Sequence, residues 1–445
     1  MSKDRYFFRN VDKELLAWSK EPDRKVLLLR GARQVGKSSA VRHLGKSFRY
    51  FVEVNFEDAE EDVKNLFRPG ISPQEICKRL SFYYKTPVVA GETLLFLDEI
   101  QAWIPAISKL RYFYEQHPEL HVIAAGSLLE FALEELPSFG VGRIRSVFMY
   151  PFAFNEFLHA TGNEQLAHEY QNASPSKPLP KIVHSMILKN MEIFMLFGGM
   201  PAVVAEYVKS QDFSKCQQAI HDLLLSFRGD FAKYKSRVPA SRIGEVFTSI
   251  ANQAEGKFIY ERASEQASNR QVKDALELLI MAGLAYPVTH TSANGIPLGA
   301  EVNAKFRRMF LFDTGIFQRV LGMDVSRLLL SSDFRAVNSG ALAEIFVGLE
   351  LLKASSCYYP ITLYYWQREK HQSHAQVDFV IQRDEQIIPI EVKSGTSGKM
   401  QSLYLFMQEK KLDYGVRTSL ENFSRYDKIR VYPLYAISNL LLNPE

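Results

Sequence analysis

Apolar runs alternate with helical patterns over the first third of the chain. Four continuous apolar runs, KVLLLRG, YFVEVNF, ETLLFLDEI and HVIAAGS, occupy residues 25–31, 50–56, 92–100 and 121–127. A helical stretch, KSSAVRHLGKSF, follows the first run. Continuous apolar strands that alternate with helices are typical of a parallel sheet covered on both faces. The pattern therefore predicts an α/β domain with a parallel sheet over residues 1–180, which the segment SVFMYPFAFNEFL is expected to leave.

The pattern changes after QNASPSKPLPK at residues 171–181, whose Ser and Pro content is typical of a linker. Residues 182–290 then show the helical spacing of apolar positions. Within them and beyond, residues 269–295 predict a helix, a Gly stop, a strand and an Asn-Gly turn. Helices followed by a hairpin are the plan of a winged helix. We therefore expect a helical, winged-helix-like region over residues 181–330.

A third pattern begins near residue 331. GALAEIFVGLELLKAS is a strong amphipathic helix, and KMQSLYLFMQEKKL also shows helical spacing. ITLYYWQ, QVDFVIQ and IIPIEVKS have the composition and length of strands. The sequence therefore predicts a small α/β domain over residues 331–445.

The composition fits several domains in a reducing compartment. The 445 residues exceed the roughly 250–300 over which a single core grows. A net charge of +4 and a pI near 8.7 permit nucleic-acid binding but do not argue for it. The three cysteines lie far apart and form neither a disulfide framework nor a metal clip. The N-terminus lacks a signal-peptide core, and the longest apolar run, residues 193–205, is too short to span a bilayer, so we expect a cytoplasmic protein without a membrane partner.

GARQVGKS, which lies between a predicted strand and a predicted helix, is a complete Walker A loop. Its glycines let backbone N–H groups turn toward phosphates, and the helix N-terminus adds positive potential. Lys37 is expected to reach the β- and γ-phosphates of ATP, and the Ser38 hydroxyl to coordinate Mg²⁺. A chance glycine turn is the alternative. The residues expected to contact the nucleotide here are Gly31, Ala32, Arg33, Gln34, Val35, Gly36, Lys37, Ser38 and Ser39.

The apolar run TLLFLDE ends in two acidic residues, as a Walker B strand does. Asp98 is expected to hold the Mg²⁺ shell, and Glu99 to orient or activate the attacking water. An apolar strand that ends in two acids is also a common strand end, which is the alternative.

Three further positions are candidates near the nucleotide. Ser127 ends the next strand, where ATPases of this kind keep a small polar sensor, and Asn55 ends an earlier strand, where it is a candidate to hold Glu99 inactive. A strand-end cap is the alternative for each. Arg143 is the candidate arginine finger, with Arg145 as its rival and a surface role as the alternative.

Together, GARQVGKS, LLFLDEIQ, AAGSLLEF and MYPFAFNEFL resemble a bacterial and archaeal group of AAA-type P-loop ATPases. Members of that group carry a C-terminal domain of uncharacterised function, which FGGMPAVV, RMFLFDTGIFQRVLG and VDFVI…PIEVKSG resemble here. The resemblance spans nearly the whole chain. It implies a P-loop NTPase sheet with ATPase activity and a restriction-endonuclease-like, PD-(D/E)xK fold for the tail. The group is expected to have Thr where this chain has Ala125.

Four polar residues of the tail follow the order that such metal-dependent nucleases use. Asp378 and Glu391 would hold Mg²⁺, Lys393 would stabilise the attacking hydroxide, and Glu344 on the preceding helix would complete the shell. Glu391 and Lys393 share one face of a strand because successive side chains alternate. The alternative is a solvated salt-bridge face on an ordinary half-exposed strand.

The middle region offers two cations for a DNA groove, Arg270 and Lys273 on the predicted helix, although a protein-packing helix is the alternative. His290 and His374 lack partners at metal-ligand spacing and are expected to be ordinary loop or surface histidines.

The expected function is ATP hydrolysis coupled to a nuclease-like tail that binds nucleic acid, DNA ahead of RNA. One alternative is an AAA-type ATPase whose C-terminal domain is a non-catalytic binding or oligomerisation module acting on a protein partner. A second is a nucleotide-dependent switch with negligible turnover. An arginine finger supplied in trans would require a homo-oligomer.

Overall fold

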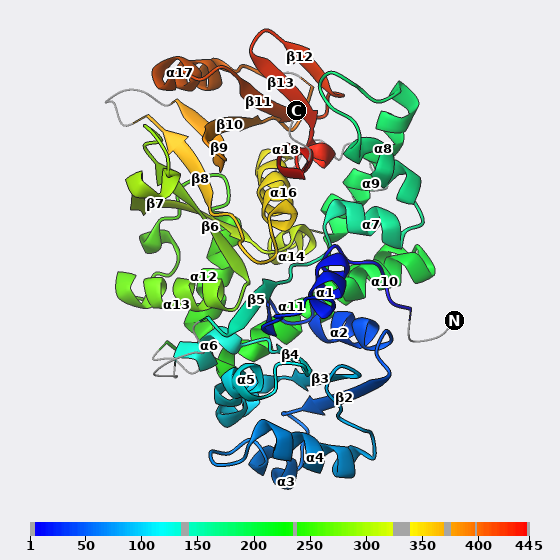
Figure 1. The fold of residues 1–445 in the computed structure, drawn as a ribbon. Coiled ribbons are helices and arrows are strands. Elements are labelled where there is room, and N and C mark those ends of the chain that lie inside the picture. Colours follow the sequence, from blue (N-terminus) through cyan, green and yellow to red (C-terminus); the bar gives the residue numbers. More distant parts are fainter. Residues whose placement is uncertain are drawn as a thin grey trace. The chain divides into compact units, whose positions relative to one another are not determined.

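The computed structural model describes residues 5–134, 142–234, 238–323, 339–368, 375–396 and 398–442. The chain divides into two compact units (Figure 1). Unit 1 comprises Met1–Tyr150 and Met281–Gly283, and unit 2 comprises Pro151–Ile280 and Leu284–Glu445. Among the described helices, none combines the length and the apolar character that crossing a membrane requires.

Unit 1 contains a five-stranded parallel sheet in the order β2-β3-β4-β1-β5. Every residue of β3 and β4 is buried, as are four of the five residues of β1, so the central strands are covered on both faces. The parallel sheet that the apolar runs predict is therefore confirmed. Its strands are β1 (Val26–Arg30), β2 (Tyr50–Asn55), β3 (Thr93–Asp98), β4 (His121–Ala125) and β5 (Ile144–Phe148).

Strand β5 corrects one expectation, because its segment was expected to leave the sheet. Ile144 lies opposite Val26, and the pairing with β1 continues to Phe148. Apart from Val147, its side chains are only partly buried, which is why the segment lacks the continuous apolar signal of the other strands.

Helices of unit 1 pack around this sheet, and α4 and α5 contribute Leu80 and Phe113 to a core that also contains Leu95 of β3. The helices are α1 (Val11–Ser19), α2 (Lys37–Gly45), α3 (Glu61–Asn65), α4 (Pro73–Tyr84), η1 (Ile100–Ala102), α5 (Ile104–Gln116) and α6 (Leu129–Glu134).

Unit 2 begins with a long helical segment, which confirms the helical middle region. Its helices before the hairpin are α7 (Phe154–Ala160), α8 (Glu164–Gln171), α9 (Lys181–Phe197), α10 (Pro201–Ser210), α11 (Phe213–Asp230), η2 (Phe231–Lys233), α12 (Ala240–Asn252), η3 (Tyr260–Arg262) and α13 (Asn269–Met281). The later ones are η4 (Leu298–Glu301), α14 (Thr314–Val320), α16 (Ser339–Ala354), α17 (Gln401–Lys410), η6 (Leu434–Ala436) and α18 (Asn439–Leu442).

The sheet of unit 2 has eight strands, both parallel and antiparallel, in the order β12-β13-β11-β10-β9-β8-β6-β7. The antiparallel hairpin β6–β7 follows α12 and α13, as a winged-helix plan predicts (Figure 1). However, β6 also pairs in parallel with β8, with Val288 opposite Leu363, so the hairpin extends the sheet of the tail. The strands are β6 (Ala285–Thr291), β7 (Val302–Leu311), β8 (Leu363–Gln367), β9 (Gln376–Arg383), β10 (Gln386–Val392), β11 (Gly415–Ser419), β12 (Ser424–Tyr426) and β13 (Ile429–Pro433).

Candidate nucleotide site and C-terminal polar cluster

The loop between β1 and α2 has the backbone shape of a phosphate-binding loop. Gly31 and Gly36 have φ angles of +136° and +98°, and Gln34 between them has φ of +64°. A side chain at Gly31 would place its Cβ 2.1 Å from the Met149 carbonyl oxygen, so only glycine fits there. Gly36 is the N-cap residue, directly before the first residue of α2, so the loop runs directly into a helix N-terminus.

Lys37 is buried against this loop. Its Nζ donates to the carbonyl oxygens of Gly31 and Ala32, at 2.9 and 2.8 Å. Burial lowers the pKa of Lys37 to about 8, and the neighbouring carboxylates of Glu99 and Asp98 oppose that shift. The lysine thus lies within electrostatic reach of both Walker B acids. The prediction that the two motifs share one site requires this proximity.

Asp98 and Ser38 meet beside the lysine. The carboxylate of Asp98 accepts a hydrogen bond from the Ser38 hydroxyl, and burial raises the pKa of Asp98 overall. Arg42 approaches the same carboxylate at 3.9 Å. Hydroxyl and carboxylate oxygens are hard ligands of the kind that Mg²⁺ prefers. Because the two groups already lie in hydrogen-bond contact, these residues fit a Mg²⁺ ion.

Glu99 is held by hydrogen bonds from its backbone and to its side chain. It has φ of +46°, and its N–H donates to Asp98 Oδ1 at 3.0 Å. Its Oε2 accepts hydrogen bonds from Gln101 Nε2 at 2.6 Å and from Ser127 Oγ at 3.3 Å. Ser127 is therefore in direct contact with the Glu99 carboxylate. A Cβ at Gly126 would lie 2.1 Å from Gln101 Oε1, so glycine at that position leaves room for the contact.

Asn55 and Arg143 have other partners in this structure. Asn55 lies opposite Asp98 in the β2–β3 register, but its Oδ1 accepts from the N–H of Glu57 at 2.9 Å. Within the described part of the chain, no hydrogen bond joins Asn55 to Glu99. Arg143 forms an ion pair with Glu115, and its rival Arg145 pairs with Glu21 at 2.7 Å.

In unit 2, three of the predicted polar residues lie together, Asp378 on β9, Glu391 on β10 and Lys393 directly after β10. Lys393 Nζ is 2.7 Å from Glu391 Oε1, and Asp378 Oδ2 accepts from the Val392 N–H at 2.8 Å. Burial, with repulsion from Asp378, raises the pKa of Glu391 to about 7. Burial also raises the pKa of Asp378. The two carboxylates are therefore close neighbours, as the sequence predicts.

An arginine from β7 joins this cluster. Arg308 is 1% exposed, forms an ion pair with Glu344 and lies near enough to Asp378 to favour its charged form. Arg417 acts in the same way on Glu391. With Lys393, three cations therefore face the three carboxylates of Glu344, Asp378 and Glu391. The sequence order of the tail, a helix with Glu344 followed by strands with Asp378 and the Glu391–Lys393 pair, does not indicate Arg308. This arginine comes from the middle region of the chain.

The polar groups of the cluster are paired with one another in this structure. Each of its carboxylates already has a cation or a backbone N–H as partner, and no group of three His, Cys, Asp or Glu side chains suited to a metal is found among the described residues. The buried atoms without a hydrogen-bond partner in that part of the chain include Glu391 Oε2, but also Nε and Nη1 of Arg308 and the Tyr365 and Thr418 hydroxyls. A cation would satisfy the carboxylate oxygen and leave the nitrogen donors unmet.

The remaining sequence candidates lie in and near the hairpin. Arg270 and Lys273 are exposed on α13. His290, expected in a loop or at the surface, is instead 3% exposed in β6, where its Nε2 lies 3.0 Å from the Gln367 carbonyl oxygen. The expectation was wrong because β8 covers the second edge of β6. His374 lies outside the described residues.

Three family models match the chain in succession. Residues 23–158 match an AAA domain, residues 188–327 a domain of unknown function (DUF8612), and residues 339–437 another domain of unknown function (DUF4143). Residues 23–158 form an AAA-type P-loop ATPase domain. The family match covers both Walker motifs, and the loop, lysine and acids have the arrangement described above. The two regions that follow this ATPase domain have no assigned role.

Comparisons beyond the family models are distant. No curated protein matches the chain. Solved structures with similarity include the Walker-type ATPase of Pyrococcus abyssi, at 17% identity and a TM-score of 0.46, covering 72% of this chain and 97% of that one. The Orc1 protein of Aeropyrum pernix in complex with DNA has 16% identity and a TM-score of 0.29, with coverages of 73% and 95%. At these TM-scores the similarities do not establish a function for this chain.

Unit 1 also contains a buried arginine that the motifs do not indicate. Arg9 is 5% exposed, and its two terminal nitrogens donate to the carbonyl oxygens of Val35 in the Walker A loop and Tyr150, each at 2.7 Å. It thereby ties the N-terminal segment to the loop. Gln101 is the other contact that the sequence analysis missed, although it follows directly in the motif LLFLDEIQ.

Proposed function

We propose that this protein binds Mg-ATP and hydrolyses it at the loop between β1 and α2. The observation that carries the proposal is that Lys37 lies within electrostatic reach of both Asp98 and Glu99 at one edge of the parallel sheet. Carboxyl ends of parallel strands meet at such an edge, where α/β proteins bind ligands. The nucleotide substrate follows from the ATPase domain itself.

Each residue has a distinct part in the proposed reaction. Bound Mg²⁺, held by Ser38 and Asp98, supplies charge neutralisation on the phosphates. Lys37 exchanges its two loop carbonyls for phosphate oxygens, which keeps it protonated. Glu99 holds the attacking water, while Ser127 fixes the orientation of its carboxylate.

Arg143 remains our candidate for the arginine finger. Because it pairs with Glu115 in its own chain, we propose that it acts on the nucleotide of a second copy, in a homo-oligomer. Asn55 remains a candidate regulator of Glu99. To accept a hydrogen bond or approach Glu99, the Asn55 side chain would give up its hydrogen bond from the Glu57 N–H.

Phosphate release tests the proposed hydrolysis. Glu99→Gln keeps the shape of the side chain but removes its charge, and we expect it to lower kcat about 100-fold or more while nucleotide still binds. Glu92→Gln is the matched control, because Glu92 forms only an exposed ion pair with Arg49 just before β3. Phosphate release that Glu99→Gln leaves unchanged would contradict hydrolysis and favour a switch with negligible turnover.

For unit 2 we propose nucleic-acid binding without cleavage, under control of the nucleotide state of the ATPase domain. A γ-phosphate and its Mg²⁺ commonly hold such switch elements in place. The balance of three cations against three carboxylates supports a non-catalytic cluster. A metal-dependent nuclease is the second candidate, favoured by the proximity of Asp378, Glu391 and Lys393.

Incubation with plasmid DNA and Mg²⁺ or Mn²⁺ separates these two roles. We expect bound but intact plasmid. Cleavage that Asp378→Ala abolishes, with phosphate release unchanged, would establish the nuclease instead. If the protein neither binds nor cuts DNA or RNA, unit 2 is a module for a protein partner. Binding measured with ADP and with a non-hydrolysable ATP analogue tests the control by nucleotide, and equal affinities would refute it.

A further inference from the structure

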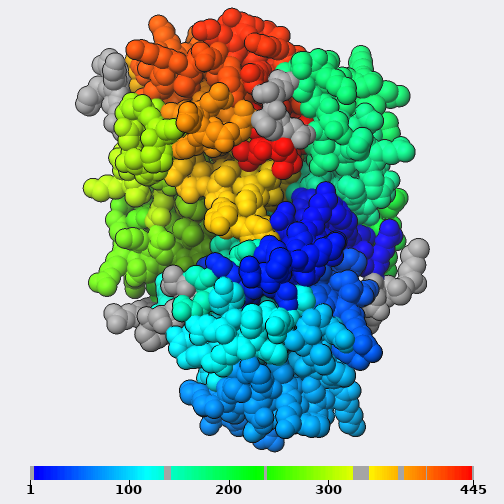
Figure 2. Space-filling view, viewed as in Figure 1, coloured from blue at the N-terminus to red at the C-terminus, as the bar shows by residue number. Residues whose placement is uncertain are grey.

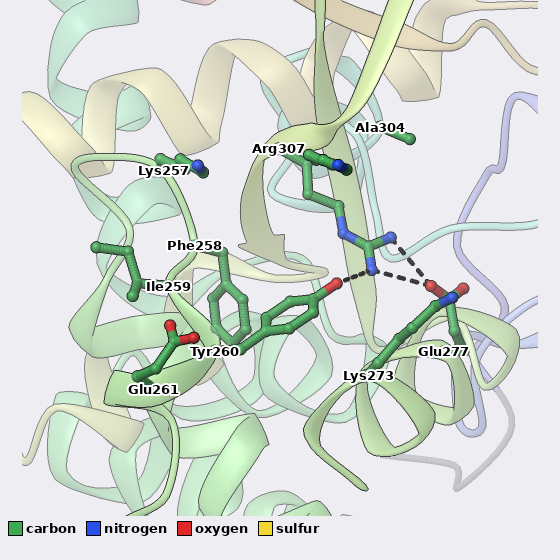
Figure 3. Close-up of a pocket in the computed structure, with 10 residues that line it drawn as sticks. Lys257, Phe258, Ile259, Tyr260, Glu261, Lys273, Glu277, Ala304 and Arg307 are labelled. Atoms are coloured by element: carbon green, nitrogen blue, oxygen red, sulfur yellow. Dashed lines mark hydrogen bonds and ion pairs between the residues drawn. The ribbon is translucent and has the colours of Figure 1, made fainter. Parts of the chain in front are cut away.

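A cavity of about 550 Å³ opens beside β7 in unit 2, away from the carboxylate cluster of β9 and β10. Its walls are the segment that follows α12, the outward face of α13 and the middle of β7 (Figure 3). The yellow-green segment that includes β7 reaches the molecular surface in Figure 2. The volume lies within the roughly 300–1,000 Å³ typical of ligand sites.

The walls of this cavity are bonded to one another before any ligand arrives. Phe258 N–H donates to the Arg307 carbonyl oxygen at 2.8 Å, which fastens the segment after α12 to the edge of the sheet. The Arg307 guanidinium donates to the Tyr260 hydroxyl at 2.6 Å and to Glu277 Oε1 at 3.0 Å, which joins that segment to α13 (Figure 3). A preformed site spends little of its binding energy on ordering its own walls.

The cavity has an excess of positive charge that the protein does not neutralise. Because Arg307 is paired with Glu277, the charges left over are those of three exposed lysines, Lys257, Lys273 and Lys305, against the single carboxylate of Glu261. None of the three forms an ion pair within the described parts of the chain. Lys257 lies over the ring of Phe306, 3.8 Å from its centre.

We propose that this cavity binds the phosphate backbone of a nucleic-acid strand. The inference rests on the nucleic-acid role proposed above and locates the binding site of that role in this cavity. Three lysines from three separate chain segments suit a ligand that carries several phosphates in a row, and Arg270 extends the positive surface one turn along α13 from Lys273. The ring of Phe306, 39% exposed and with Lys257 over one face, adds an aromatic surface beside them.

A nucleic acid fits the cavity better than an acidic peptide does. Glu261 lines the cavity, and its carboxylate is held by the side-chain amide of Asn269 at 2.7 Å. A carboxylate in that position can accept hydrogen bonds from base amino groups, whereas it repels the side chains of an acidic peptide. The lysines meet phosphates at the rim, and the carboxylate meets a base.

The test is the affinity of the full chain for a fluorescent oligonucleotide, single-stranded or duplex, measured by polarisation across a salt series. Three phosphate contacts on a single strand give a slope of about −2, or about a 20-fold loss of affinity between roughly 50 and 200 mM salt. We expect the combined variant Lys257→Ala, Lys273→Ala, Lys305→Ala to lose that slope and at least tenfold in affinity.

Matched variants make the outcome decisive. Lys189, Lys209 and Lys215 are exposed lysines on α9, α10 and α11 of the same unit, and replacing them with Ala removes the same charge. Equal weakening by both triple variants would show nonspecific attraction and overturn the site, as would an unchanged affinity of the first. Competition by polyglutamate as strong as by unlabelled oligonucleotide would overturn the choice of nucleic acid. With nucleotide left out of both samples, Lys37→Ala, which abolishes the proposed hydrolysis, should bind the oligonucleotide as the wild type does, so the two proposals fail separately.

Discussion

Replacing Arg308 with Met removes one cation from the buried cluster of unit 2. The arginine is 1% exposed and pairs with Glu344, which is 20% exposed, and it also lies near Asp378. Its loss leaves Glu344 without its ion-pair partner and removes one of the two cations that favour the charged form of Asp378, which keeps Lys393 and the Val392 N–H. Met keeps the unbranched apolar stem of the arginine, so the packing of that stem on β7 changes little.

The expected cost follows from the burial of both partners. Breaking a buried ion pair by removing one side costs about 3–5 kcal/mol, because the remaining charge is desolvated and unpaired. Glu344 keeps some contact with water, so we expect about 3 kcal/mol. Replacing both partners, as Arg308→Met with Glu344→Gln, leaves no unpaired charge at that pair, and we expect it to recover at least half of the loss.

Urea unfolding monitored through Trp366 measures this cost in the correct unit. Trp366 is 4% exposed on β8, and the other two tryptophans, Trp18 and Trp103, both belong to unit 1. In a background with Trp18→Phe and Trp103→Phe, a loss of about 3 kcal/mol shifts the midpoint by about 1 M urea if the slope is near 3 kcal/mol per M.

Two results would refute this reasoning. One is a cost below about 0.5 kcal/mol for Arg308→Met, which would mean that the pair is solvated in solution. The other is a double variant as unstable as the single one, which would show that the packing of the arginine matters and its charge does not. Arg368→Met is the control, because its ion pair with Glu409 is one-quarter exposed on both sides and is expected to contribute under about 1 kcal/mol.

Three further predictions concern the ATPase domain. The pKa of Lys37 near 8 lies below its unfolded value of 10.5, so the free protein loses this charge as pH rises through about 8; ATP affinity, measured by calorimetry, should fall in that range, and Lys37→Arg should abolish the fall. Arg9→Met removes the donor to the Val35 carbonyl and should weaken ATP binding about tenfold, since a charge-assisted hydrogen bond contributes about 1.5–3 kcal/mol. Gly126→Ala should displace Gln101 from Glu99 and lower kcat about tenfold with little change in KM.

Each of these predictions has a control in the chain. The pH effect fails if Lys37→Arg and the wild type lose affinity in parallel above pH 8. Arg49→Met removes an exposed arginine of the same domain, and an equal loss of ATP affinity would remove the case for Arg9. Gly229→Ala adds a methyl group into open space on α11, so unchanged kcat is expected there. Normal turnover by Gly126→Ala would exclude a role for Gln101.

The linkage at Lys37 also has a sign for stability. Between about pH 8 and 10.5 the unfolded chain binds more protons at Lys37 than the folded chain does. The contribution of this residue to stability therefore rises with pH across that window, while ATP affinity falls. Opposite pH dependences of stability and ligand affinity are expected for a buried lysine that binds an anionic ligand.

The sequence alone determines the nucleotide-binding part of this protein to a large extent. Gly31, Gly36 and Lys37 are local in sequence, and their role depends on one turn and one helix start. Asp98 and Ser127 follow from the parallel sheet, because the carboxyl ends of its strands lie at one edge. The side-chain spacing along β10 likewise places Glu391 and Lys393 together.

Only the tertiary structure decides which charges meet over long distances. Arg308 lies on an edge strand of the hairpin, Glu344 on α16 and Asp378 on β9, and their meeting depends on the pairing of β6 with β8. Arg9 reaches Val35 in the same nonlocal way. The sequence pattern around a basic residue in an apolar stretch does not indicate its ion-pair or hydrogen-bond partner. Burial and charge pairing depend on how the whole chain packs. That is why the sequence indicates the carboxylates and the lysine of the tail, whereas only the fold shows that Arg308 pairs with Glu344 beside them.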